Sequence, residues 1–434
     1  MRSTKLLGGW RLALFLLPWL LFQGHDACGD VAPGDVIDRT NWEKAQDLLP
    51  ESVLNWVKNG DFILNVGELT YDLKEYFPEW VQASCKANLG KYDLNEKDTI
   101  VETATGKSPG FIEGIPFPVI DENDPHAGAK AIYNREYGLL FNVGNCVYRM
   151  YCRWLGKAGF ERDIGALYIN APMDGHLACK SLPNPEGVLR YTIISVTKPR
   201  DVAGFALMLW RYKDDRQDMN LSYIPAIRRI RRMSPANRSD SFVGSDFCID
   251  DPYGYDGKIT AFQWKLARKQ DALVPFVSTD PVRVTKNSDG EWVTTQHKGI
   301  VYGHQKEGWT GVPWAPVNLT WIKRRVYVIE AVSQDPYYNY GRMHIWADVD
   351  SYGILYKVIY DRAGTYWKTF YGGVSGVQGD DDKTRFVMVR MQNIVDDRTQ
   401  HSSVIWWTES DQMTFNANLN MDDFTLSGFQ KYCK

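Results

Sequence analysis

The chain has 434 residues and a formal net charge of −3, from 50 basic and 53 acidic side chains. This nearly balanced charge argues against a protein that binds nucleic acid over its whole surface, because such binding needs an excess of basic groups. The length allows one large domain or two ordinary ones. Aromatic residues make up 13% of the chain, which indicates amphipathic surfaces, a lined cavity or an aromatic-rich sheet.

Residues 1–29 have the pattern of a secretory signal peptide. A positively charged start precedes an apolar run from Leu12 to Phe22, and Ala27 and Gly29 satisfy the small-x-small rule for cleavage. Two alternatives stay open: an uncleaved anchor, for which the apolar run is short, and lipidation of Cys28. We therefore expect an exported chain.

All of the seven cysteines except Cys28 follow the predicted cleavage point, and the even number that remains permits disulfides in an exported chain. They are Cys85, Cys146, Cys152, Cys179, Cys248 and Cys433. Their spacing with the histidines matches no zinc pattern. Cys146 and Cys152 fall in a stretch that we predict to be helical. Their separation places them on different faces of that helix, so we do not expect them to pair.

The region 30–163 is predicted to be mainly helical, because capping signals and apolar periodicity recur along it. The expected helices cover residues 40–49, 50–60, 76–90 and 124–159. In the last of these, Asp124 is placed to cap the helix and Pro125 to open it.

From residue 164 onward the pattern changes to strands. Residues 342–350 and 413–420 alternate between apolar and polar side chains, which is typical of strands with one buried face. The run 202–210 is apolar on both faces and should be covered on both sides. Further strands are expected at 190–197, 259–266, 324–331, 354–360, 365–371 and 385–391. The sequence thus predicts an α+β fold, in which helices from 30–163 pack on a large antiparallel sheet over 164–434 as one composite domain.

Motifs for hydrolysis, phosphate binding and metal binding are missing from the sequence. Neither a G-x-S-x-G elbow, an H-E-x-x-H pair nor a Gly-rich phosphate loop is present. Ser245, Asp246 and Asp250 lie together in "GSDFCIDD", but no histidine is near them in sequence. The acidic stretches 348–353 and 380–382 do not fit a calcium loop. We therefore expect no enzyme, no cofactor and no metal.

Two short stretches invite a functional interpretation. The turn 335–341 carries three tyrosines, which either pack on a neighbouring loop or line the mouth of an apolar cavity. The stretch 223–234 carries Arg228, Arg229, Arg231 and Arg232. Strand alternation distributes these arginines over both faces. We expect them to pair with Asp240, Asp246, Asp250 and Asp251. The alternative is a role at a cavity mouth, where they would meet an anionic headgroup.

Several stretches together resemble a bacterial family of domains of unknown function, DUF1329. They are residues 41–61, "GIPFPVIDENDPHAGAKAIYN" at 114–134, and then "LSYIPAIRRIRRMS", "GSDFCIDD" and "FQWKL" in the family's order. The last three are also similar to the central motif of outer-membrane lipoprotein-sorting proteins. The resemblance covers about residues 35–431.

This resemblance implies a strongly curved antiparallel sheet, an open half-barrel like that of lipoprotein carriers, with helices on its concave side. It implies a non-enzymatic periplasmic carrier or chaperone for a lipid, lipoprotein or other lipophilic cargo. Implied partners are a resistance-nodulation-division exporter or an outer-membrane protein, with contact to a membrane surface and none to nucleic acid. The candidate cavity-lining residues are Phe205, Leu207, Leu209, Ile345, Trp346 and Phe415.

The resemblance leaves two other interpretations open. The chain can be an interaction subunit of an exporter complex, with its cavity filled by its own helices. A hydrolase would require Ser245, an acid and a histidine to meet in space. A disulfide from Cys248 to Cys179 or Cys433 also stays open.

Overall fold

The computed structural model describes residues 30–294, 299–408 and 410–434, and those from Val31 onward form one compact unit. The predicted signal peptide and Cys28 lie outside the described residues. Within the described ranges, no helix is both long and apolar enough to cross a membrane.

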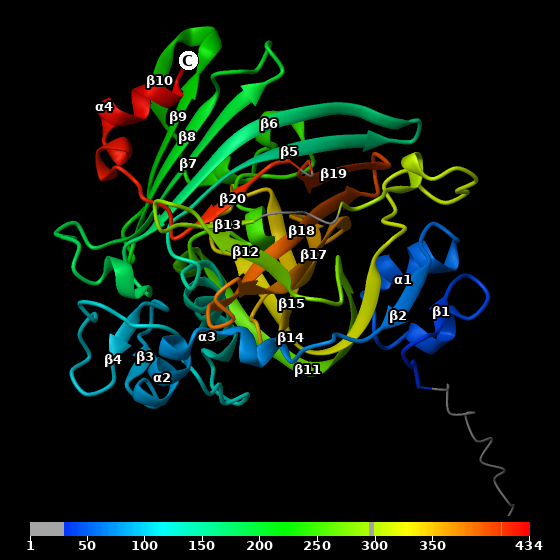
Figure 1. The fold of residues 1–434 in the computed structure, drawn as a ribbon, viewed down its shortest axis with the longest axis horizontal. Helices are drawn as coiled ribbons and strands as arrows, with labels where there is room; N and C mark the ends of the chain where they lie inside the picture. Colours follow the sequence, from blue (N-terminus) through cyan, green and yellow to red (C-terminus); the bar gives the residue numbers. More distant parts are fainter. Residues whose placement is uncertain (1–29, 295–298, 409) are drawn as a thin grey trace, which may run out of the picture. The chain divides into compact units, whose positions relative to one another are not determined.

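One large sheet dominates this unit (Figure 1). Its antiparallel strands follow the spatial order β11, β14, β15, β16, β17, β18, β19, β5, β6, β7, β8, β9 and β10. The bounds are β5 Cys146–Gly156, β6 Gly159–Pro172, β7 Val188–Lys198, β8 Ala206–Tyr212, β9 Met219–Ile224, β10 Arg229–Arg232, β11 Phe262–Phe276, β14 Thr320–Ser333, β15 Tyr340–Asp348, β16 Ile354–Asp361, β17 Tyr366–Gly379, β18 Arg385–Asp396 and β19 His401–Trp406.

Shorter strands join this sheet or lie apart from it. They are β1 Val36–Ile37, β2 Leu64–Gly67, β12 Val282–Lys286, β13 Trp292–Thr294 and β20 Met413–Phe415 in the sheet, and β3 Tyr92–Leu94 with β4 Ile100–Glu102 as a separate pair. Register shifts interrupt long strands, as at Gly165 and Ala166 in β6 and between Leu266 and Arg268 in β11. Such irregularities bend a strand and increase its twist, and Figure 1 shows these strands curving.

The helices are few and short. They are α1 Glu51–Lys58, α2 Glu79–Ala87, α3 Ala127–Arg135, which continues as a π-helical turn over Glu136–Leu140, and α4 Leu426–Phe429. The predicted α+β fold is confirmed. The predicted helix over 124–159 is wrong beyond residue 140, because Cys146–Gly156 forms β5.

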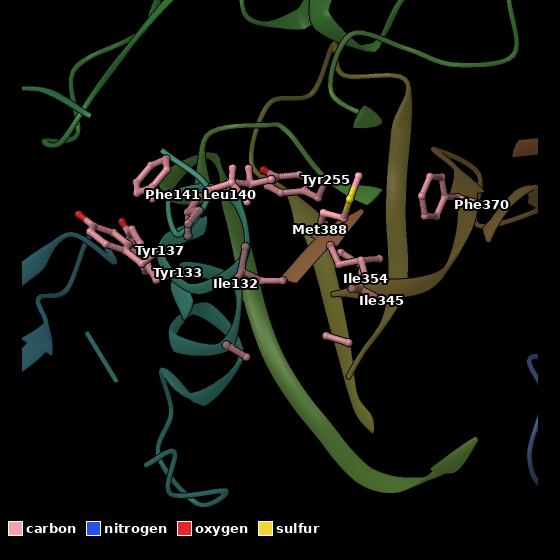
Figure 2. Close-up of a cluster of buried hydrophobic side chains, with 14 of the residues drawn as sticks. Ile132, Tyr133, Tyr137, Leu140, Phe141, Tyr255, Ile345, Ile354, Phe370 and Met388 are labelled. Carbon is pink, nitrogen blue, oxygen red and sulfur yellow. The ribbon is translucent and has the colours of Figure 1, made fainter. Parts of the chain in front are cut away.

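Helix α3 packs on the face of the sheet that we call the inner face. Figure 2 shows Ile132 of α3 and Leu140 of the π-helical turn in the same buried cluster as Ile345 and Ile354 of the sheet. The helix can approach closely because Gly128 has no side chain, and a Cβ there would lie 3.1 Å from the backbone of β11. Asp124 helps to begin the helix by accepting a hydrogen bond from the backbone N–H of His126 at 2.7 Å.

The opposite, outer face is also covered. Residues from α1, such as Val53 and Trp56, share a buried cluster with Val328 and Trp346 of the sheet. A third cluster places Phe424 and Phe429, from the C-terminal segment, on Ala206, Met208 and neighbouring residues of β6 and β7. The prediction of cover on both sides holds for residues 206–209, because Leu207 and Leu209 are buried as well. Residues 202–205 of the predicted strand precede β8 and are not part of it.

A buried ion network ties the inner elements to the sheet. Arg190 of β7 is fully buried and donates to Glu136, which begins the π-helical turn, through Nε at 2.9 Å. Its Nη2 donates to Asp256. Arg211 of β8 donates to Asp218 at 3.0 Å. Burial of such charges is tolerated only when each has a partner, so the network specifies where α3 and the segment around Asp256 must sit.

The arginine cluster at 228–232 does not take part in such pairing. Arg228 adopts a left-handed conformation (φ 49°) at the turn before β10, and the other three lie on β10 at the edge of the sheet. All four are exposed, and no carboxylate among the described residues pairs with them. The predicted pairing with Asp240, Asp246, Asp250 and Asp251 is therefore wrong.

All six cysteines of the described residues are free thiols, so the structure contains no bridge from Cys248 to Cys179 or Cys433. Cys146 and Cys152 lie on one strand with their side chains on the same face, since even separations share a face of a strand.

We predict that Arg190→Gln lowers the free energy of unfolding by about 3–5 kcal/mol, because it removes the nearest cation of two buried carboxylates, Glu136 and Asp256. Only the more distant Arg211, at 3.8 and 4.0 Å, then remains beside them. The matched variant Arg231→Gln should change it by less than about 0.5 kcal/mol. Urea unfolding followed by circular dichroism measures both. Equal effects of the two substitutions would contradict the role of the network.

Candidate functional site: an apolar route beneath a charged roof

A segment without regular strands, residues 242–256, covers the inner face of β5, β6, β18 and β19, and we call it the roof. It includes the "GSDFCIDD" stretch. The backbone turns sharply at both of its ends, where Val243 and Tyr253 have positive φ angles of 51° and 57°. Glycine follows each of these residues, also at positive φ. These conformations let the roof fold back on the sheet without forming a strand.

Charge pairs fasten the roof along its length. Each of its four aspartates is buried and has at least one basic partner from outside the roof. The pairs are Asp246 with His401, Asp250 with Arg238, Asp251 with Lys357 and Asp256 with Arg190. Asp246 also accepts from the Ser403 hydroxyl at 2.7 Å. The roof is therefore held on the sheet by charge-assisted hydrogen bonds, which are stronger than neutral ones.

The tyrosine turn at 335–341 contributes to the same attachment. Tyr338 and Tyr340 are buried, and their hydroxyls donate to Asp250 and Asp251 at 2.9 Å each. Tyr337 is 81% exposed. Of the two interpretations of this turn, packing on a neighbouring loop is the one that the structure supports, and that loop is the roof.

Two small apolar cavities lie beneath the roof and the π-helical turn. The first, of about 40 Å³, is bounded by Met150, Ala166 and Ile194 of the sheet and by Phe242 and Phe247 of the roof. The second, also of about 40 Å³, lies under Leu139 and Leu140 and borders Met388 and Phe415. Tyr148 and Gln392 line both cavities, so the two are neighbours.

An open cleft continues this series to the surface. It measures about 920 Å³ and is lined by residues such as Trp80, His176 and Phe386. Val143 and Phe415 line both this cleft and the second cavity. The cleft and the two cavities thus form a sequence of three spaces, which we call the route, separated by a few side chains.

The six predicted lining residues do not surround one cavity. Phe415 separates the cleft from the second cavity, and Phe205 contacts Phe242 of the roof with ring centroids 6.0 Å apart. Leu207 and Leu209 are buried on β8. Ile345 lies in the inner core, whereas Trp346 lies in the outer core, because neighbouring strand residues point to opposite faces.

A catalytic triad is not assembled around Ser245. Its hydroxyl donates to the carbonyl of Phe242 at 2.7 Å, and no histidine of the described residues lies within hydrogen-bonding distance of it. Ser403 and His401 both bind the same oxygen of Asp246. The carboxylate of Asp246 therefore lies between the serine and the histidine. The histidine is not placed to remove the serine proton.

The basic partners of the roof could not be recognised from the sequence. Arg190, Arg238, Lys357 and His401 belong to no recognisable motif, and three of them lie far along the chain from their aspartates. One signal was available: Arg190 and Lys357 stand within apolar strand patterns, where a charge needs a buried partner.

A family model described as "Protein of unknown function (DUF1329)" matches residues 36–430. No curated protein matches the chain. Among solved structures, a domain from Vibrio parahaemolyticus named for outer membrane lipoprotein sorting is 17% identical with a TM-score of 0.46, covering 72% of this chain and 100% of its own.

Two further solved structures are similar. A DUF1329 family protein from Desulfovibrio piger is 15% identical with a TM-score of 0.46, covering 70% of this chain and 99% of its own. A LolA superfamily protein from Nitrosomonas europaea is 12% identical with a TM-score of 0.39, covering 68% and 94%. At these scores the solved structures do not say what this chain binds.

The attachment of the roof at Asp246 should be visible in the titration of His401. Burial lowers the pKa of His401. The hydrogen bond and charge of Asp246, together with Glu161, raise this pKa by more than burial lowers it, so it lies above its usual value. The stability from this pair is therefore fully present below the pKa of unfolded histidine and is lost as the pH rises through the folded pKa.

We predict that Asp246→Asn lowers the pKa of His401, since burial then dominates. Nuclear magnetic resonance titration of the imidazole protons measures it. His176 serves as the control, because burial alone lowers its pKa to about 4, and the substitution should not move it. A His401 pKa that is unchanged in the variant would show that the pair does not form in solution.

Proposed function

This chain belongs to the DUF1329 family, and we propose that it is a non-enzymatic periplasmic carrier or chaperone. Its proposed cargo is a lipid, a lipoprotein or another lipophilic molecule. The observation that carries the proposal is the route. Its open cleft has a volume in the range usual for ligand sites, and it leads past Phe415 to apolar cavities on the inner face.

The chemistry of such a protein is burial. Each methylene group moved from water into an apolar space contributes about 0.8 kcal/mol. The two cavities are too small for a long acyl chain, so loading must widen them. Methionine side chains at Met150 and Met388, which line the cavities, adapt readily because they are unbranched and flexible.

The proposed location is the periplasm, reached through the signal peptide expected at residues 1–29, with association to the outer membrane if Cys28 is lipidated. The proposed partner is a resistance-nodulation-division exporter or an outer-membrane protein that accepts the cargo. Release would follow when the partner favours a conformation in which the route is open.

A second candidate function is a non-transporting interaction subunit of an envelope exporter complex. Two observations favour it. The roof closes the inner face with paired charges. The four arginines of residues 228–232, in the turn before β10 and on β10 itself, are exposed near Ile224 and Ile227, which are 36% and 41% exposed. Such a surface suits an acidic partner or a membrane surface.

Acyl-chain length tests the carrier proposal. For the delipidated protein, calorimetric titration with saturated fatty acids of about 8 to 14 carbons should show an affinity that rises about fourfold per methylene and then levels off where the route ends. Ala166→Val narrows the first cavity, so we predict that the affinity levels off at a shorter chain.

The matched control is Ala206→Val, the same substitution on the face of β8 that contacts the C-terminal segment. It should leave the chain-length profile unchanged. Absence of acyl binding in the native protein would refute the carrier and leave the interaction subunit. Equal shortening by both variants would place the binding site outside the route.

A further inference from the structure

A second large cleft, of about 900 Å³, lies on the outer face, on the side of the sheet away from the roof. Helix α1 and the turn after β18 border it, and strands β14 to β17 form its floor. Its lining combines the aromatic residues Trp56, Trp346 and Tyr366 with the carboxyl groups of Asp61 and Asp397. Neither the proposed route nor the attachment of the roof uses any of these residues.

Asp397 is half-buried and held in a fixed position without a cation. It accepts hydrogen bonds from the indole N–H of Trp56 at 3.0 and 3.2 Å and from the hydroxyl of Tyr366. Tyr366 in turn contacts Thr369, which contacts Ser52 of α1. No basic side chain of the described residues forms an ion pair with Asp397 or with Asp61.

The charge of the cleft is unbalanced toward the negative side. Burial raises the pKa of Asp397, and the neighbouring carboxylates Asp396 and Asp61 raise it further. Burial also raises the pKa of Asp61. Asp47 and Glu51 line the same cleft, and the basic groups lining it are Arg268, which donates to Gln270, and His344, which contacts Glu330. These carboxylates are an energetic cost unless a cation joins them.

The aromatic residues supply the other half of the site. Electron-rich ring faces attract organic cations, and aromatic cages recognise quaternary ammonium groups in this way. Tyr360, which also lines the cleft, shows this kind of contact within the chain, because the guanidinium of Arg342 lies 4.6 Å from its ring centroid.

We propose that this cleft binds an organic cation, an amine or quaternary ammonium group that carries an apolar body. The carboxylates of Asp397 and Asp61 balance its charge, and Trp56, Trp346 and Tyr366 contact its apolar part. The same carboxylates repel an anion. A neutral ligand leaves their negative charge without a counter-charge. A divalent metal is disfavoured, because Asp397 already accepts from one N–H donor, Trp56, and one O–H donor, Tyr366, and no metal-binding cluster occurs in the described residues.

The test uses hexyltrimethylammonium as the probe, with hexanol and hexanoate as its neutral and anionic counterparts, in calorimetric titrations of the full mature chain. We expect the cation to bind at least ten-fold more tightly than the other two. Asp397→Asn should weaken cation binding by about ten-fold, and Asp61→Asn should act in the same direction. The asparagine at 397 still accepts from Trp56 and Tyr366, so the fold is retained, which a thermal unfolding scan verifies.

Asp380→Asn is the matched control, since Asp380 is exposed and lies outside the cleft, and it should bind the cation as the native chain does. Ala166→Val, on the inner face, should also bind it normally, which separates this site from the proposed acyl route. The inference is overturned if hexanol binds as tightly as the cation. It is equally overturned if the folded Asp397→Asn and Asp61→Asn variants both keep native affinity.

Discussion

The pairing of buried charges on the inner face of the sheet is the constraint on which the rest of the structure depends. A carboxylate moved out of water is costly unless a basic group meets it. The four aspartates of the roof can therefore be buried only where Arg190, Arg238, Lys357 and His401 stand. These contacts fix the position of the roof. The ion pair between Arg190 and Glu136 likewise fixes the position of the π-helical turn that follows α3.

The polar attachment has a consequence for the apolar groups beside it. Because the ion pairs hold the roof at fixed points, the side chains between those points need not fill all the space below, and two cavities remain. The inner face is in this way both closed and incompletely filled. The outer face differs in kind, since its large cleft carries carboxylates that no basic group of the described residues pairs with, among them Asp397. The two faces of one sheet thus differ in chemistry, with small apolar cavities on one and a cleft rich in carboxylates on the other.

Much of the fold could be predicted from sequence, because alternation is a local signal. The strand predicted over 342–350 is observed as β15, and residues 206–209 are buried on both faces. The strand predicted over 413–420 ends at Phe415, although burial continues to alternate as far as residue 418. Strand β5 was missed, although Cys146, Tyr148, Met150 and Cys152 are buried at alternate positions. The preceding helix α3 suggested continuation, and a period of two was the signal that argued against it.

The candidate site was less predictable, for a physical reason. Ion pairs such as Asp246 with His401 join residues 155 positions apart, and no local pattern records such a contact. For the arginine cluster, a local signal predicted contacts that the structure does not form. Four arginines at 228–232 suggested ion pairs with nearby aspartates. On an edge strand, however, these side chains lie in water, where arginine needs no partner. Which face of β15 a residue occupies, as with Ile345 and Trp346, also depends on the packing of distant segments.

Native mass spectrometry tests the central claim, that the inner face holds a lipophilic cargo beneath the roof, most directly. The protein should be isolated without detergent from the cells that make it. The account predicts masses above that of the mature polypeptide by the mass of an acyl-bearing molecule, and loss of this species after delipidation. The bare polypeptide mass alone, both on isolation and after incubation of the delipidated protein with acyl lipids, would contradict it.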